Sequence, residues 1–269
     1  MLSNITLGQY FPGESLIHRL DPRTKLLLFV LYIVALFLGK GLVSYAIMAI
    51  FLIVIIVMSK VPPSSLLRGL KPLWIVIIIT GVLNLLFSQG QTVLFTWRRI
   101  SVTLEGCYNA GFMIVRIILL VLCAFMLTYT TSPILLTDGL ERLLRPFQKI
   151  GLPVHELAMM MSIALRFIPT LVEETDKIIS AQKARGADFE SGNILRRAKA
   201  LIPILVPLFI SAFRRADELA IAMECRCYHG GEGRTRLHQL KYARKDYVAY
   251  VIGIVLCVAV GILGRRFGL

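Results

Sequence analysis

Residues 157–228 contain two long segments of helical periodicity that end in similar runs, Ala181-Gln182-Lys183-Ala184-Arg185-Gly186 and Ala222-Met223-Glu224-Cys225-Arg226-Cys227. Each run places one arginine between two small residues at the C-terminal end of an expected helix. A cation there complements the negative end of the helix dipole, so local stability alone accounts for either arginine. Two matched ends in one chain indicate a shared role as well. The candidate site residues are therefore Ala184, Arg185, Gly186, Cys225, Arg226 and Cys227.

The composition indicates a membrane protein. Of the 269 residues 57% are hydrophobic, the formal net charge is +14, and the mean hydropathy is +0.74. A soluble domain hardly tolerates this combination, whereas a basic inner-membrane protein does. The five cysteines form an odd count scattered through apolar runs, so we expect no disulfide framework. Residues 1–22 do not resemble a removable signal peptide, so the first apolar run is expected to stay and direct insertion.

Five apolar runs are expected to cross the membrane: residues 26–38, 42–58, 73–87, 110–129 and 247–263. The first two are near the lower limit, because about 20 residues fill a hydrocarbon core of about 30 Å. They form either a tight helical hairpin, which we favour, or partly tilted interfacial helices. Lysines and arginines gather before the first run, between the second and third, and between the fourth and fifth. This distribution predicts a cytoplasmic N-terminus in a prokaryotic cell membrane, although Arg265 and Arg266 oppose it.

Two stretches near the spans leave alternatives open. Residues 88–105 are polar, contain Arg98 and Arg99, and alternate weakly in polarity, which fits a short interfacial helix or a loop. Arg116 lies a few residues inside the fourth apolar run. It is either a functional charge within the membrane or a side chain that snorkels toward the headgroups, which is the commoner case.

The segment between the fourth and fifth spans is too long for a simple connection and is expected to have its own structure. The sequence therefore predicts a membrane domain of four helices (residues 1–131), a cytoplasmic domain of about three helices (residues 132–244) and a final transmembrane helix (residues 245–269). The class is an all-α polytopic membrane protein with about five transmembrane helices. In the cytoplasmic domain, Pro133 suits the first position of a helix that Pro146 ends.

The second and third helices of residues 132–244 are the long ones. The second has an apolar stripe, and Glu173 and Glu174 are assigned to its polar face. The third, residues 194–228, is apolar on nearly all sides at first, and Pro203 and Pro207 predict a bend there. Residues 200–213 are alternatively a sixth span, but their length of 14 residues with two prolines argues against it.

The sequence lacks the motifs of common nucleotide and zinc sites: it has no phosphate-binding loop and no His-Glu-x-x-His run. Any ATP hydrolysis is therefore expected in a partner. Cys225, Cys227 and His229, with Glu224, are the one plausible cluster for the alternative of a membrane-embedded enzyme. A lone Cys-x-Cys with one histidine is a weak signal, so we assign no cofactor, metal ligand or catalytic residue. Membrane topology and anionic lipid explain the basic side chains, so no nucleic acid is expected.

Several ordered motifs lie between residues 15 and 236: His18-Arg19-Leu20-Asp21-Pro22-Arg23-Thr24-Lys25, Arg166-Phe167-Ile168-Pro169, Ala181-Gln182-Lys183-Ala184-Arg185-Gly186 and Arg214-Arg215-Ala216-Asp217-Glu218-Leu219-Ala220. Together they resemble the transmembrane T component (EcfT, CbiQ-like) of energy-coupling factor transporters. The resemblance implies a non-catalytic scaffold in the lipid bilayer. It links two ABC-type ATPases to a separate membrane protein, the S component, which captures a vitamin or metal ion.

The resemblance also implies roles for the two matched ends. In that family two coupling helices end in short motifs centred on arginine that reach the ATPases, so Arg185 and Arg226 correspond to the coupling arginines. The second motif departs from the commoner Ala-Arg-Gly because Cys225 and Cys227 flank Arg226. Since the central arginine remains, the departure affects the local packing and leaves the role in place.

Overall fold

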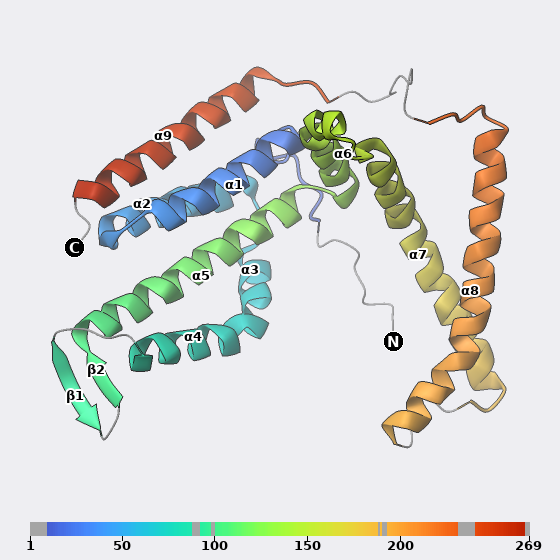
Figure 1. The fold of residues 1–269 in the computed structure, drawn as a ribbon, viewed down its shortest axis with the longest axis horizontal. Coiled ribbons are helices and arrows are strands. Elements are labelled where there is room, and N and C mark those ends of the chain that lie inside the picture. Colours follow the sequence, from blue (N-terminus) through green and yellow to red (C-terminus); the bar gives the residue numbers. More distant parts are fainter. Residues whose placement is uncertain are drawn as a thin grey trace. The chain divides into compact units, whose positions relative to one another are not determined.

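The computed structural model describes residues 10–87, 92–97, 100–187, 189, 193–230 and 240–266. Within these ranges the regular elements are helices and one two-stranded hairpin, so the all-α class is confirmed (Figure 1). The chain divides into two compact units, one with Gly8–Leu140 and Leu240–Leu269, the other with Glu141–Gln239. Arg98, Arg99 and the side chains of Arg265 and Arg266 lie outside the described residues.

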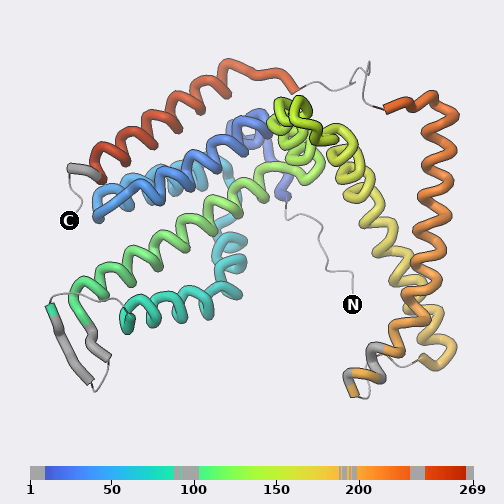
Figure 2. The backbone as a smooth tube through the Cα atoms, in the orientation of Figure 1, coloured from blue at the N-terminus to red at the C-terminus, as the bar shows by residue number. Residues whose placement is uncertain are grey.

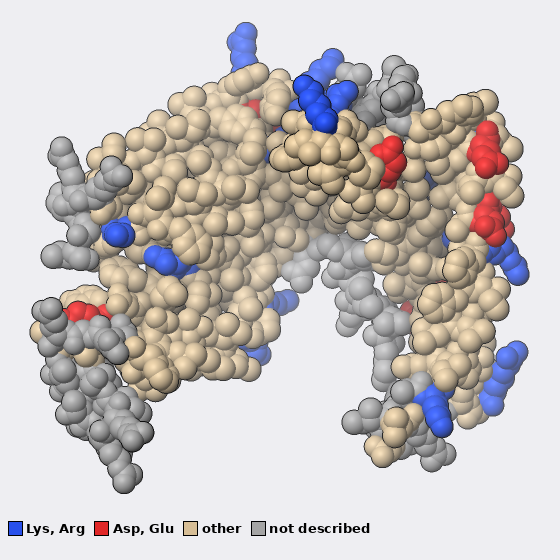
Figure 3. Space-filling view, viewed as in Figure 1, with Lys and Arg blue, Asp and Glu red and all other residues tan. Residues whose placement is uncertain are grey.

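Among the described residues, five helical segments are long and apolar enough to cross a membrane: α2 (Gly41–Ser59), α3 with α4 (Pro63–Phe87), α5 (Leu104–Thr130), α7 (Val154–Ala184) and α9 (Arg244–Gly264 of Arg244–Arg266). The expected number is confirmed, but the set differs from the expected one. By length and composition alone, α1 (Pro22–Leu38), with 17 residues, is not in this set, whereas α7, with 31 residues, is. The chain is therefore a multi-pass membrane protein, and its visible face over α1, α2 and α5 is mostly uncharged (Figure 3).

The core of the unit with Gly8–Leu140 lies between α1, α2, α5 and α9 (Figure 1). α1 and α2 form the expected helical hairpin, since only Gly39 and Lys40 separate them. The hydroxyl of Tyr32 donates to the Met48 carbonyl across this hairpin at 3.1 Å. The hydrophobic core cluster of buried side chains is Tyr32, Ala35, Leu36, Tyr45, Met48, Leu52, Val61, Leu66, Leu119, Met126, Tyr129 and Val260.

Between α2 and α5 the chain forms short elements: α3 (Pro63–Leu70), a 3-10 turn (Lys71–Leu73), α4 (Trp74–Phe87), β1 (Val93–Trp97) and β2 (Ile100–Thr103). The two strands pair antiparallel, so the expectation of a helix or loop at residues 88–105 was wrong. In β2 apolar and polar residues alternate with the period of two that a strand requires (Ile100, Ser101, Val102, Thr103), whereas β1 begins with the apolar run Val93-Leu94-Phe95.

Arg116 on α5 contacts two aromatic residues of the α1–α2 hairpin. Its Nε donates to the Tyr45 hydroxyl at 2.8 Å, and its guanidinium lies 5.2 Å from the centre of the Phe37 ring. Both partners belong to the turn end of the α1–α2 hairpin. Contacts between a guanidinium and an aromatic face stabilise the cation. Arg116 thus has a structural role within the chain, which neither sequence alternative had described.

The unit with Glu141–Gln239 contains a 3-10 turn (Arg145–Ile150), α7 and α8 (Ile194–Glu224), and α6 (Pro133–Leu144) leads into it. As expected, Pro133 begins α6, and its α-helical geometry ends before Pro146. Gly151 has a φ of 87°, a left-handed conformation that lets the chain turn before α7.

α8 is a single helix that continues through Pro203 and Pro207. Its axis changes direction along its N-terminal half, which contains both prolines (Figure 2). This agrees with the predicted bend, because each proline removes a main-chain hydrogen bond and crowds the preceding turn. α8 is not among the described helices that qualify as spans, so the sixth-span alternative is not supported.

A buried ammonium lies at the start of α1. Lys25 directly precedes the first apolar run, residues 26–38, and is only 8% exposed. Its Nζ donates to the carbonyl oxygens of Thr130 at 2.8 Å and His18 at 3.1 Å. Desolvation lowers the pKa of Lys25 to about 8, although the carboxylates of Asp246 and Asp21 oppose the shift.

This lowered pKa predicts a pH dependence of stability. In the unfolded chain Lys25 has its ordinary pKa of 10.5, so between about pH 8 and 10.5 the unfolded state binds more protons than the folded state. The free energy of unfolding then rises with pH in this window. We expect the wild type to gain thermal stability relative to Lys25→Met as pH rises through the window, measured in detergent. Lys40→Met, at an exposed lysine, should follow the wild type; parallel profiles for Lys25→Met and the wild type would contradict the prediction.

Candidate functional site

The C-terminal end of α7 is closed by two main-chain hydrogen bonds. The amide of Gly186 donates to the Lys183 carbonyl and the amide of Ala187 to the Gln182 carbonyl, each at 3.0 Å. Gly186 is left-handed, with a φ of 84°. This combination is a Schellman motif, which satisfies carbonyl groups that a helix end leaves open. Arg185 is its capping residue.

The C-terminal end of α8 has the same geometry. The amide of Cys227 donates to the Glu224 carbonyl at 2.8 Å, and the amide of Tyr228 donates to the Met223 carbonyl at 3.0 Å. Cys227 occupies the left-handed position with a φ of 55°, where the first end has a glycine. Arg226 is the capping residue. The likeness seen in the sequence therefore extends to the backbone, and we call Ala184–Gly186 and Cys225–Cys227 the two tips.

Both tips are exposed to solvent at all six candidate site residues. Among the residues that the structure describes, the guanidinium groups of Arg185 and Arg226 form no hydrogen bond or ion pair. An arginine side chain carries five N–H donors in a planar fork. Each tip thus presents, at the negative end of a helix, a cation that no other described residue pairs with.

The tips lie at opposite ends of the α7–α8 pair. The two helices run antiparallel, because Gln182 near the first tip donates to the Pro203 carbonyl at 3.4 Å, while Met223 near the second tip lies beside Ile163. From residue 203 to residue 226 there are 23 steps along the chain. At a rise of about 1.5 Å per residue, the tips are about 35 Å apart.

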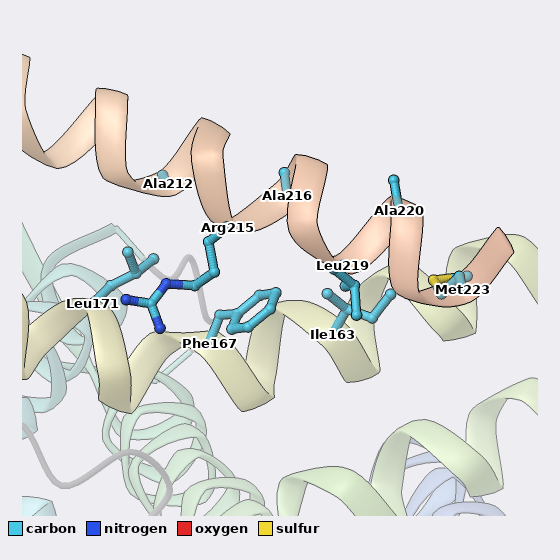
Figure 4. A pocket seen from close by; sticks show the side chains of 9 residues that line it. All are labelled: Ile163, Phe167, Leu171, Ala212, Arg215, Ala216, Leu219, Ala220 and Met223. Carbon is cyan, nitrogen blue, oxygen red and sulfur yellow. The ribbon is translucent and has the colours of Figure 1, made fainter. Parts of the chain in front are cut away.

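A mainly apolar groove runs between α7 and α8 (Figure 4). On α7 it is lined by residues spaced four apart, Ile163, Phe167 and Leu171, which is the spacing of one helical face. The α8 side is lined by Ala212, Arg215, Ala216, Leu219, Ala220 and Met223.

A polar bridge joins the same two helices. The carboxylate of Glu174 accepts a hydrogen bond from Arg215 Nη2 at 3.0 Å and another from the Ser211 hydroxyl. The side chains of Arg215 and Glu174 are 33% and 25% exposed. The assignment of Glu174 to the polar face of its helix was therefore wrong. Glu174 follows Leu171 by three residues, so it lies on the same face of α7 as the groove-lining residues. This spacing is present in the sequence and could have indicated the correct face.

Comparison with known proteins identifies the family. A family model described as cobalt transport protein (CbiQ) matches residues 13–237. The chain belongs to this family. It is 55% identical over 269 residues to the energy-coupling factor transporter transmembrane protein EcfT of Acidaminococcus fermentans, with 100% of this chain and 99% of the relative covered. It is 54% identical over 266 residues to that of Clostridium kluyveri, with 98% of each chain covered.

A third relative, EcfT of Bacillus subtilis, is 48% identical over 256 residues, with 95% of this chain and 97% of the relative covered. The resemblance inferred from the motifs at residues 15–236 is confirmed.

The metal alternative at Glu224, Cys225, Cys227 and His229 gains no support. Within the described residues, which include these four, no group of three or more His, Cys, Asp or Glu side chains is placed to hold a metal ion.

Cys227 in the second tip has a left-handed backbone conformation that suits glycine better, whereas the first tip already has Gly186 at this position. Substitutions at these two positions should therefore change stability in opposite directions. Left-handed geometry costs a non-glycine residue about 1–2 kcal/mol. Cys227→Gly should therefore raise the free energy of unfolding by about 1 kcal/mol, and Gly186→Ala should lower it by a similar amount. Thermal unfolding of the purified chain in detergent measures both. Cys225→Ala, one position before the cap, is the neutral control. A loss of stability in Cys227→Gly would contradict the prediction and show that a contact of the Cys227 thiol stabilises the fold by more than the left-handed geometry costs.

Proposed function

We propose that this chain is the energy-coupling membrane subunit of a transporter, a non-catalytic scaffold that links two ABC-type ATPases to a separate substrate-binding membrane protein. One observation carries the proposal: two tips with the same backbone geometry, each with an exposed arginine that has no ion-pair partner among the described residues, lie about 35 Å apart on one helix pair. Two equal ends suit two similar partner subunits. The names of the relatives, transmembrane proteins of energy-coupling factor transporters, support the same function.

The chemistry of the tips suits contact with a soluble partner. A guanidinium at a protruding helix end offers donors in a fixed fork that matches carboxylates and main-chain carbonyls in a groove. The cation of Arg185 or Arg226 would keep the favourable interaction with its own helix while it binds. Movement of an ATPase subunit would then displace the helix end that it holds, and the stiff helices α7 and α8 would carry the displacement.

The first half of α8 suits contact with an apolar partner. Its exposed side chains include Leu201, Ile202, Leu205, Val206 and Phe209, each at least 46% exposed. Exposed apolar surface of this extent marks a site of contact with a membrane or another protein. We assign it to the substrate-binding membrane component and to the lipid around it.

The direct test of the proposed function is partner identification. A tagged chain purified from its native cell should carry two ATPase subunits and a small membrane protein, identified by mass. The purified chain alone should not hydrolyse ATP. ATP turnover by the chain alone, or stoichiometric zinc on it, would instead favour a membrane-embedded enzyme with its site at residues 224–229.

The proposed function requires both tips on the cytoplasmic side, which predicts a labelling pattern. In intact cells, a single cysteine at position 185 should resist an impermeant thiol reagent, because the block between α5 and α9 is expected inside. Lys40→Cys, at the exposed turn between α1 and α2, should react. Both variants need a background without the native cysteines. Labelling at position 185 and protection at position 40 would reverse the topology.

A further inference from the structure

The long segment between α5 and α9 is attached to the unit with Gly8–Leu140 at two places. It begins after Thr130, the last residue of α5, its residues up to Leu140 still belong to this unit, and the chain returns to the unit at Leu240, shortly before α9 begins at Arg244. The same short segment, Asp21–Lys25 at the start of α1, contacts both places. This segment is part of the motif that extends from His18 to Lys25.

Lys25 holds the place where the chain leaves. Its buried ammonium donates to the Thr130 carbonyl at 2.8 Å. A second contact adds to it: Gly139 on α6 lies against the same segment, so close that a Cβ on Gly139 would be 3.0 Å from the Pro22 Cβ and 3.4 Å from the Arg23 amide nitrogen. The first helix after Thr130 thus rests directly on the start of α1.

Arg23 holds the place where the chain returns. Its Nη2 donates to the Leu240 carbonyl at 3.0 Å, and its guanidinium lies 4.1 Å from the centre of the Tyr242 ring. The Asp21 carboxylate holds the guanidinium at two points, to Nε at 3.1 Å and to Nη2 at 3.0 Å. The side chains of Arg23 and Asp21 are 11% and 2% exposed, so this pair is largely removed from solvent.

Asp246 on α9 completes the cluster. Its carboxylate accepts hydrogen bonds from the Asp21 amide at 2.9 Å and from the Ala243 amide at 2.8 Å. The start of α1, the end of α5 and the start of α9 are therefore joined through five consecutive residues, Asp21 to Lys25. Arg23 and Lys25 bond to main-chain carbonyls, so they hold the path of the chain itself.

We propose that Asp21–Lys25 is the clamp through which movement of α7 and α8 passes into α1 and α9, with Arg23 and Lys25 as positioning residues. This inference rests on the proposed function. The segment between Thr130 and Leu240 cannot shift at either end without displacing the clamp or breaking hydrogen bonds to buried charged groups. Such bonds are costly to leave unmade, because a buried charge would lose its partner.

Hydrogen exchange in the assembled complex tests the clamp. The chain is purified with its ATPases and membrane partner, and amide exchange is followed by mass spectrometry with and without ATP. In the wild type, ATP should change exchange in α7 and α8 and also at the starts of α1 and α9. In Arg23→Gln and Lys25→Met, the change in α7 and α8 should remain and the change in α1 and α9 should be lost. Arg19→Gln, at a neighbouring arginine whose side chain is 60% exposed, should behave as wild type.

The outcomes separate the clamp from the proposed function. If the wild-type chain carries no ATPases, or if ATP leaves α7 and α8 unchanged, the proposed function itself fails. If the complex responds to ATP and both variants still transmit the response to α1 and α9, the clamp is wrong. Where Arg23→Gln prevents assembly, Tyr242→Leu keeps the Arg23 hydrogen bonds and removes a ring, at a residue 41% exposed, that contacts the guanidinium and the Tyr247 and Tyr250 rings of α9; a partial loss in α9 is expected. A normal α9 response in that variant overturns the clamp at the returning end.

Discussion

Reversing the charge at both tips, with Arg185→Glu and Arg226→Glu together, should abolish co-purification of the ATPases while the membrane helices stay folded. If each arginine inserts into a groove on a partner, truncating one such buried and hydrogen-bonded cation costs about 2–5 kcal/mol of the contact. Reversal adds repulsion and also places an anion at the negative end of each helix. Pull-down of the ATPases and substrate uptake by proteoliposomes measure the effect.

The single variants should behave differently from the double variant. One intact tip keeps both ATPases nearby if they bind each other, because tethering raises the effective concentration at the damaged tip. In each single variant, substrate uptake should therefore fall while the ATPases still co-purify with the chain. The matched control is Arg166→Glu with Arg214→Glu, which makes the same change in charge at exposed positions within α7 and α8.

The alternative for the tips is that each arginine only complements its own helix dipole. That role predicts a loss of about 0.3–1 kcal/mol of stability per site and normal ATPase binding. Near-normal uptake in the double variant would rule out the coupling role. Loss of pull-down in the Arg166 and Arg214 control would show instead that overall charge governs assembly.

Glu174→Ala should loosen the α7–α8 pair and so disturb the spacing of both tips. The variant removes the acceptor of Ser211 and Arg215 and leaves the Arg215 cation beside an apolar groove. Hydrogen bonds to charged groups contribute about 1.5–3 kcal/mol, and partial exposure of this pair places the loss toward the lower end. Thermal unfolding measures the loss of stability.

Spin labels at positions 185 and 226 measure the effect of Glu174→Ala on geometry. The wild type should give a narrow distribution near the spacing of about 35 Å that the helix rise implies, and Glu174→Ala should broaden it. Glu173→Ala is the matched control, since Glu173 is the exposed neighbour on the same helix. A narrow distribution in Glu174→Ala would show that the apolar groove alone sets the geometry.

Part of the candidate site, the two tips, could be predicted from the sequence. Arg185 and Arg226 were recognisable because helix ends are local: a stripe of helical periodicity, then a small residue that accepts left-handed geometry. Glu174 was misassigned because a pattern of polarity shows that a residue is polar without showing which helix lies opposite. Its partners Ser211 and Arg215 are 37 and 41 positions away along the chain. The strands at residues 93–103 were missed because their alternation is short and lies next to long apolar helices.

By itself, the sequence determined the all-α membrane class, the helical hairpin of α1 and α2, the bend in α8 and the two arginine tips. Each of these follows from interactions among residues close together along the chain: apolar periodicity, proline geometry and helix capping. Only the tertiary structure decided that the tips lie at opposite ends of an antiparallel pair, that Glu174 bridges this pair, and that Lys25 and Arg23 bond to Thr130 and Leu240. These features depend on polar groups that find partners between 21 and 217 positions away along the chain, and such hydrogen bonds produce no periodic pattern in the sequence.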